Sequence, residues 1–266
     1  KYIINDNDLQ TVTEKLFNES AHELYRYVSI KYQGHATSKN STDNAPERLL
    51  NVSSEVFSNT IIKSLVKLFD NYEMDTYQPE IITDEEDAEE NEFIDNLLST
   101  NNMMYTMDYL SDRGFFENDL KVYKEVLKDI WFHQYSRTKG INGSSGFEHV
   151  FMVERKPRKG IIGLHNWIFF FLNELEKRID YFGFLRDIEF KAAVAQVHFT
   201  YHGKHKTSTM FIGTTPELEM SLYTLCFFAR PNKKCKISFA GRSFGIQTYI
   251  SRNNDKKLIG TAFPLI

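Results

Sequence analysis

A change in side-chain periodicity near residue 140 constrains the fold of this chain more than any other feature. Before this point, apolar residues recur at helical spacing over residues 56–69 and again over residues 120–131. Residues 140–146 then contain three glycines and two serines, a composition that predicts a flexible connection. Beyond it β-branched and aromatic residues alternate, which predicts strands over residues 193–201, 208–212, 237–240 and 246–250.

This change predicts an α+β fold. A mainly helical N-terminal lobe is expected over residues 1–140, followed over residues 141–266 by a lobe of antiparallel sheets with a few helices, the two forming one domain. In the first lobe, Thr83 and Glu86 predict a capping box that opens a helix reaching about residue 98. In the second lobe, helices are expected over residues 166–178 and 216–228.

Bulk composition fits a globular protein. The chain has 266 residues, 41% of them hydrophobic, which is enough for a sizeable core. Its longest apolar run, residues 167–172, is far shorter than the roughly 18 residues that span a bilayer, so we expect a soluble protein with no membrane partner. The sequence begins with Lys1 and has no signal peptide, which predicts a processed or truncated product. The compartment stays open between secreted and cytoplasmic.

Charge is divided unevenly along the chain. Residues 1–146 contain 14 Lys and Arg against 26 Asp and Glu, a charge of −12, whereas residues 147–266 contain 18 against 10, a charge of +8. A polyanion responds to the local field, so the second half is suited to bind RNA although the whole chain carries −4. A chance imbalance between the halves is the alternative.

Two cysteines, Cys226 and Cys235, flank a segment that resembles a hairpin turn. A hairpin would bring them together as a disulfide, and two free thiols in neighbouring strands fit the sequence equally well.

Two histidines of the second half, His149 and His165, each follow closely after a glycine. Cleavage of RNA without a metal needs two such groups, one to take the 2′-hydroxyl proton and one to supply a proton to the departing 5′-oxygen. Histidine can do either near neutral pH. His149 is expected to enter a strand. His165 is expected at a helix start, where the dipole favours neutral imidazole. A structural role is the alternative for each.

Several sequence blocks, in the same order, resemble the EndoU family of uridylate-specific, placental protein 11-like endoribonucleases. The blocks are GFEHVFMVE at residues 146–154, GLHNW at 163–167, FIGTTPELE at 211–219, IQTYI at 246–250 and IGTAFP at 259–264. Residues 68–72 and 83–93 also fit the pattern. The resemblance therefore covers nearly the whole chain.

The resemblance implies one catalytic lysine about eight residues before the glycine of the FIG block, where its ammonium would stabilise the pentacoordinate phosphorus. This chain has His205 at that spacing, between Lys204 and Lys206. We favour Lys204, because Ser208 follows it four positions later as in the family, and keep Lys206 as the second candidate. The other lysine would belong to a solvated basic turn.

The resemblance also implies residues that bind the nucleotide or support the site. Thr248 and Tyr249 match family positions that face the nucleotide, and a tyrosine ring can stack on a base. Hydroxyl groups can bond to the uracil edge, so Ser208 and Thr209 are candidates for uridine choice. Glu148 and Glu154, on either side of His149 in the sequence, are expected to support the site or to bind a divalent ion. The plainer interpretation is that they orient His149 or pair with Arg155 and Lys156.

Mn²⁺ or Ca²⁺ is expected as a stimulatory ion, because the resemblance implies it. The acidic residues between Asp84 and Glu92 offer oxygen ligands, although a solvated helix face is the plainer interpretation. No Cys-x₂-Cys zinc spacing is present. The metal site therefore stays unknown.

These features together predict an endoribonuclease that cuts single-stranded, U-rich RNA at uridylates, leaving a 2′,3′-cyclic phosphate and a 5′-hydroxyl. His165 is the expected base and His149 the expected acid, although the order could be reversed, and Lys204 or Lys206 stabilises the phosphorane. The protein is expected to be a monomer. A catalytically weak RNA-binding protein of the same fold and a calcium-responsive interaction protein are the alternatives.

Overall fold

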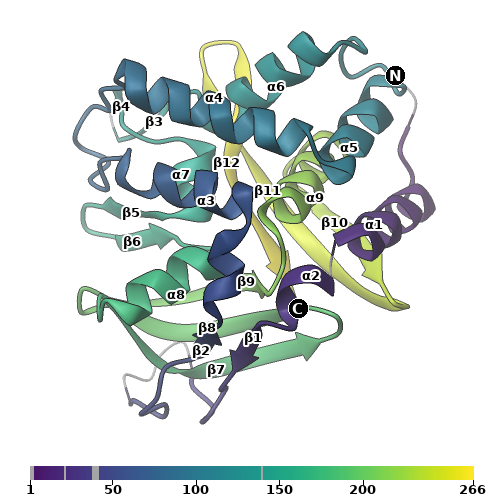
Figure 1. Ribbon diagram of the computed structural model, residues 1–266. Coiled ribbons are helices and arrows are strands. Elements are labelled where there is room, and N and C mark those ends of the chain that lie inside the picture. The colour runs from purple at the N-terminus through teal and green to yellow at the C-terminus, as the bar shows by residue number, and fades with distance from the viewer. Residues whose placement is uncertain (1–2, 21, 38–41, 139) are drawn as a thin grey trace.

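The computed structural model describes residues 3–20, 22–37, 42–138 and 140–266, and Lys1 lies outside them (Figure 1). Helices dominate the first half and antiparallel sheets the second, so the expected α+β class is confirmed. No helix in the described ranges is long and apolar enough to cross a membrane.

Six helices of the described chain precede residue 140. They are α1 (Asp6–Ser20), α2 (His22–Tyr25), α3 (Thr60–Lys67), α4 (Asp84–Leu98), α5 (Asn101–Ser111) and α6 (Leu120–Phe132). The capping box at Thr83 and Glu86 is confirmed, because each side chain bonds to the backbone N–H of the other. The periodic stretch 56–69 is divided into α3 and two short 3₁₀ turns, since the Asn59 side chain accepts from two backbone N–H groups and starts a new helix.

Three helices lie in the described part of the second half: α7 (Gly146–Phe151), α8 (Trp167–Leu175) and α9 (Pro216–Ala229). The expected helices over 166–178 and 216–228 are α8 and α9, and α8 ends three residues earlier than predicted. Asn166 caps α8 by accepting from the N–H groups of Ile168 and Phe169.

Two three-stranded antiparallel sheets form the framework of the second half, in the orders β7-β8-β9 and β10-β11-β12. Their strands are β7 (Ile179–Glu189), β8 (Ala193–Tyr201), β9 (Lys204–Ile212), β10 (Lys234–Phe239), β11 (Arg242–Asn253) and β12 (Lys256–Leu265). The four predicted strands lie within β8 to β11, except that β10 ends one residue early. Three smaller pairs complete the sheets of the described residues: β1 (Val28–Ile30) with β2 (Leu50–Val52), β3 (Ser136–Thr138) with β4 (Ile141–Asn142), and β5 (Val153–Lys156) with β6 (Gly160–Gly163).

The buried core contains residues from both halves of the chain. Helix α1 packs on β10, and α5 packs on α9 (Figure 1). The Phe17 ring of α1 lies 4.7 Å from the Phe239 ring of β10 and also meets Phe211 and Phe244. The division of the chain at residue 140 stays a prediction, and the apolar packing runs across it.

The predicted flexible connection over residues 140–146 is wrong. Its first part belongs to the β3–β4 pair, and Ser144 and Ser145 are fully buried. A Cβ atom on Gly146 would lie only 2.7 Å from the Ile259 carbonyl oxygen, and one on Gly143 only 2.1 Å from that of Gln78. These glycines therefore allow close packing of backbone, which composition alone does not distinguish from flexibility.

Cys226 and Cys235 form a disulfide, which resolves the alternative left open by the sequence. The bond joins the end of α9 to β10, so the segment between the cysteines connects a helix to a strand and is not a β-hairpin.

Candidate active site

His149 lies on α7, so the prediction that it enters a strand is wrong. The Ser145 side chain accepts from the Glu148 N–H and starts this helix, whose six residues are all buried. Ser145 and Glu148 have the S-x-x-E spacing of a helix start, and this signal could have located α7 in the sequence.

A buried carboxylate contacts Nδ1 of His149 and fixes the orientation of the ring. Its Nδ1 lies 2.5 Å from Oε2 of Glu154, which is fully buried on β5. Glu154 also accepts from the Ser144 hydroxyl and from Nε of Arg137 at 2.9 Å. The Arg137 guanidinium in turn donates to the Gly260 carbonyl oxygen on β12. The network fixes the ring of His149 with Nδ1 as the protonated nitrogen, so Nε2 carries the free lone pair.

The network also sets the charge of its members. Burial lowers the pKa of His149 to about 4, the Arg137 charge adds to this effect, and Glu154 opposes it. Burial alone would raise the pKa of Glu154, but the charges of Arg137 and His149 hold it below its ordinary value. An ionised Glu154 therefore faces a neutral imidazole in the free protein.

Backbone hydrogen bonds bring the second histidine next to the first. The N–H groups of Leu164 and His165 donate to the carbonyl oxygens of His149 and Val150 at 3.1 and 2.9 Å. Gly163 has a φ of 79°, and a Cβ there would lie 2.1 Å from the His149 carbonyl oxygen, so only glycine fits. The centroids of the two imidazole rings are 6.0 Å apart. The two predicted histidines thus share one site.

His165 precedes α8, as expected, and its ring orientation is also fixed. Its Nδ1 lies 2.9 Å from the Thr209 carbonyl oxygen and 2.9 Å from the Ser208 hydroxyl. Because the carbonyl can only accept, Nδ1 carries the proton and Nε2 the lone pair. The ring stacks on Phe263 with centroids 4.9 Å apart. Burial lowers the pKa of His165 well below its ordinary value, and the Lys206 charge adds to this.

The two candidate lysines differ in their surroundings. Lys206 lies two residues before Ser208 on the same face of β9, and its charge lowers the pKa of both His149 and His165. Burial lowers the pKa of Lys206 itself to about 8. Lys204 is exposed at the first position of β9. The placement therefore favours Lys206 over Lys204, the reverse of the expectation from spacing.

Of the two residues matched to nucleotide-facing positions, one shares a sheet face with Phe263, the residue that stacks on His165. Tyr249 and Phe263 lie on the same face of the β11–β12 pair, and Tyr249 is 48% exposed. Thr248 lies on the opposite face and is fully buried. Gln247, paired with Phe263 across the two strands, shares the face of Tyr249 and is half-buried. Sequence reasoning missed Gln247 and Phe263. The alternation of side chains along a strand could have indicated both, because Gln247 lies two residues before Tyr249 and Phe263 lies opposite Gln247 on the partner strand.

Ser208 and Thr209 contact His165 in ways the sequence did not predict. The Ser208 hydroxyl donates to the Leu164 carbonyl oxygen at 2.6 Å and touches the His165 ring, so it orients the imidazole. Thr209 holds His165 through its backbone carbonyl, while strand alternation turns its side chain to the other face of β9.

Glu148 is fully buried, and neither of its carboxylate oxygens has a hydrogen-bond partner in the described structure. Burial raises its pKa well above the ordinary value, and the charges of Glu154 and Glu80 add to this. On α4, Asp87 and Glu92 are ion-paired with Lys128 and Lys67 at the surface. Among the described residues no three His, Cys, Asp or Glu side chains gather as they do in a metal centre.

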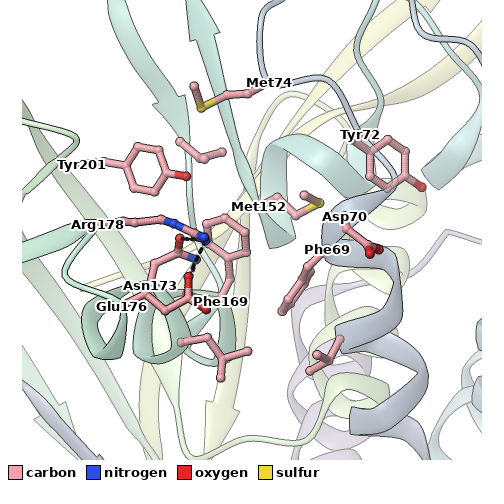
Figure 2. A pocket seen from close by; sticks show the side chains of 13 residues that line it. Phe69, Asp70, Tyr72, Met74, Met152, Phe169, Asn173, Glu176, Arg178 and Tyr201 are labelled. Carbon is pink, nitrogen blue, oxygen red and sulfur yellow. Dashed lines mark hydrogen bonds and ion pairs between the residues drawn. The ribbon is translucent and has the colours of Figure 1, made fainter.

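A separate cavity of about 330 Å³ lies between α3, α8 and the end of β8 (Figure 2). Met74, Met152, Phe169 and Tyr201 line it, and the Arg178 guanidinium at its edge is ion-paired with Glu176. The cavity is not lined by His149, His165 or Lys206, so it is distinct from the site described above.

Comparisons with known proteins agree with this arrangement. Residues 8–264 match the family model of Endoribonuclease XendoU. The chain is 34% identical to a uridylate-specific endoribonuclease EndoU of Drosophila melanogaster, over 97% of this chain and 82% of the relative. It is also 34% identical to uridylate-specific endoribonuclease B of Danio rerio, over 98% and 96% of the two chains.

A solved structure shares the fold. The structure described as XendoU, a splicing-independent snoRNA-processing endoribonuclease, superposes with a TM-score of 0.79 at 30% identity, covering 100% of this chain and 98% of that one. The chain belongs to the XendoU endoribonuclease family.

Proposed function

We propose that this protein is a uridylate-specific endoribonuclease that cleaves single-stranded RNA by attack of the 2′-hydroxyl on the adjacent phosphorus. The observation that carries the proposal is the pair of imidazoles of His149 and His165, 6.0 Å apart, each held through Nδ1. The names of the related proteins, uridylate-specific endoribonucleases, support the same activity.

His165 is proposed as the base. Its Nδ1 is occupied by the Thr209 carbonyl, so the free Nε2 lone pair is available for the 2′-hydroxyl proton. The lowered pKa keeps this imidazole neutral at neutral pH. The deprotonated 2′-oxygen then bonds to phosphorus while the bond from phosphorus to the 5′-oxygen breaks, which leaves a cyclic phosphate.

His149 is proposed as the acid that gives a proton from Nε2 to the departing 5′-oxygen. Glu154, behind Nδ1, stabilises the imidazolium form. In the free protein, burial keeps His149 neutral. A bound phosphodiester brings a negative charge next to the ring, which raises the pKa of the imidazole towards the working pH.

Lys206 is proposed to stabilise the extra negative charge on the phosphorane. Its ammonium is partly buried and adds to the positive field that Arg137 creates at His149. This excess of positive charge suits a phosphate, and it matches the positive balance of residues 147–266.

Uridine is proposed to bind over Tyr249, whose half-exposed ring can stack on the base or the ribose. The Gln247 amide on the same strand face can both donate and accept, as the uracil edge requires. Ser208 and Thr209 are assigned to the orientation of His165, and Thr248 to the packing of β11.

Stimulation by Mn²⁺ or Ca²⁺ is proposed at Glu148, whose two unpaired buried oxygens are the donors most in need of a cation. Glu80 lies near enough to raise the pKa of Glu148 and would be a second ligand. The fit is incomplete, since the described residues hold no preformed group of three ligands. Such an ion would neutralise the charge of the buried carboxylates. The proposed proton transfers and the stabilisation of the phosphorane use side chains alone.

A fluorescent oligodeoxynucleotide with a single ribouridine tests the function. We expect cleavage only 3′ of the ribouridine, with a 2′,3′-cyclic phosphate detected by mass spectrometry. The matched oligonucleotides carry a single riboadenosine or no ribonucleotide at all. Equal cleavage of the all-deoxy strand would rule out attack by the 2′-hydroxyl, and equal cleavage at riboadenosine would rule out uridine choice.

A further inference from the structure

A second pair of histidines lies on the β7–β8–β9 sheet, on the face opposite Lys206. His198 of β8 and His205 of β9 are diagonal neighbours, because His198 pairs with Thr207 and Thr200 pairs with His205. Their rings are stacked with centroids 5.2 Å apart, and Nε2 of His198 lies 3.1 Å from Nδ1 of His205. His205 is the residue that stands where the family pattern has its lysine, and the proposed function does not use it.

A bulge in β7 builds one wall of this pair. Tyr181 pairs with Phe199 and Gly183 with His198, so Phe182 is the extra residue between them. Its ring meets those of His198 and His205 at centroid distances of 5.8 and 5.2 Å. The bulge therefore places the Phe182 ring against the two imidazoles and restricts the rotation of their side chains.

The separation of the two nitrogens suits a metal ion. Zinc binds imidazole nitrogen at about 2.0–2.1 Å, so two nitrogens on one ion at an angle of roughly 95–110° stand about 3.0–3.4 Å apart. The distance between His198 Nε2 and His205 Nδ1, 3.1 Å, falls within this range. We propose that His198 and His205 form a binding site for a borderline divalent ion such as Zn²⁺ or Ni²⁺, with water in the remaining positions.

Hydrogen bonding prepares His198 for this role. Its Nδ1 lies 3.1 Å from the Thr207 hydroxyl, which can accept the Nδ1 proton and leave the Nε2 lone pair free. His205 is exposed, so an ion can reach the pair from solvent. Without the ion, a single proton shared between the two nitrogens makes the hydrogen bond seen here, and the ion would replace that proton.

Two protein ligands make a site that exchanges its ion readily. No third His, Cys, Asp or Glu joins the pair among the residues that the structure describes, so water completes the coordination. The site lies on the sheet face opposite Ser208 and His165, and it neither needs nor contributes to the proposed cleavage.

Titration calorimetry with zinc chloride and with nickel chloride tests the inference. The titrations use the H149A variant as the parent protein. Without His149, the active-site pair of histidines cannot bind an ion together and add to the measured stoichiometry. In this background we expect H205Q to bind one ion per chain fewer than its parent. H202Q changes an exposed histidine in the adjoining turn, outside the pair, and should bind like its parent.

A second set of variants tests the geometry. T207A removes the hydroxyl next to His198 Nδ1 and should weaken zinc binding about 10- to 100-fold, whereas T207S keeps the hydroxyl and should retain the affinity. Circular dichroism checks that each variant is folded. Unchanged zinc and nickel binding in folded H205Q would overturn the proposal.

Discussion

Replacement of Lys206 tests the electrostatic core of the proposed mechanism. Its ammonium is partly buried and close enough to lower the pKa of His149 and His165, the proposed catalytic histidines. A unit charge about 4 Å from the phosphorane contributes roughly 4 kcal/mol at an effective dielectric constant of about 20. Each 1.36 kcal/mol is about a tenfold change in rate, so K206A should lower kcat by about 10²- to 10³-fold. K204A removes an exposed charge and should leave kcat within about twofold.

The pH dependence gives an independent measure of the same group. Burial lowers the pKa of Lys206 to about 8, so the ammonium is present below that pH and is lost as the pH rises through it. Roughly nine-tenths of the lysine is charged at pH 7 and one-tenth at pH 9, which predicts a roughly tenfold fall in rate from this group alone. K206R should keep its charge and move the alkaline limb to higher pH.

Initial rates on the single-ribouridine oligonucleotide, measured from pH 5 to pH 10, check both expectations. The matched pair K206A and K204A isolates the position of the charge, since the two residues share one strand. An equal loss of kcat in both variants would refute the assignment, and so would an alkaline limb in K206R unchanged from that of the parent.

Three further changes test the neighbouring groups. S208A removes the hydroxyl that orients His165 and should lower kcat about tenfold with little change in KM, as measured by steady-state kinetics; an unchanged kcat would contradict the orienting role. Y249A should raise KM about 5- to 150-fold through loss of about 1–3 kcal/mol of stacking, while Y249F should keep most of the affinity; a similar KM in all three proteins would exclude stacking. The double variant C226S/C235S, with a sequence separation of 9 between its sites, should lose about 2–4 kcal/mol of unfolding free energy in urea, and an equal midpoint would show that the disulfide does not stabilise the fold.

The elements that sequence predicted well carry local signals. The helix after Thr83 begins where predicted because the capping box involves residues only three positions apart. The strands β8 and β11 are rich in β-branched and aromatic residues, so their type is visible without knowledge of their partners. Both histidines were identified by their types and by their neighbours along the chain.

The short helix α7 was missed because its period cannot be seen. Six residues make fewer than two turns, and the apolar, β-branched sequence around His149 resembles a buried strand equally well. The start signal from Ser145 to Glu148 was present but stood inside a glycine-rich segment interpreted as a flexible connection.

The groups that tune the site could not be predicted because they depend on long-range contacts. Arg137 reaches Glu154 and the Gly260 carbonyl oxygen from β3, a strand that precedes the expected second lobe. Phe263 stacks on His165 across a sequence separation of almost one hundred residues. Likewise, the choice between Lys204 and Lys206 depends on which side chain is buried near the histidines, which spacing along the chain does not specify.

The alternation of β9 separates the two roles proposed for this strand. Lys206 and Ser208 belong to one face, and His205 and Thr207 belong to the other. Saturation mutagenesis along the strand should therefore give alternating effects. Substitutions at even-numbered positions should change turnover, and those at odd-numbered positions should change ion affinity. Insertion of a single residue would exchange the two faces and abolish both properties at once.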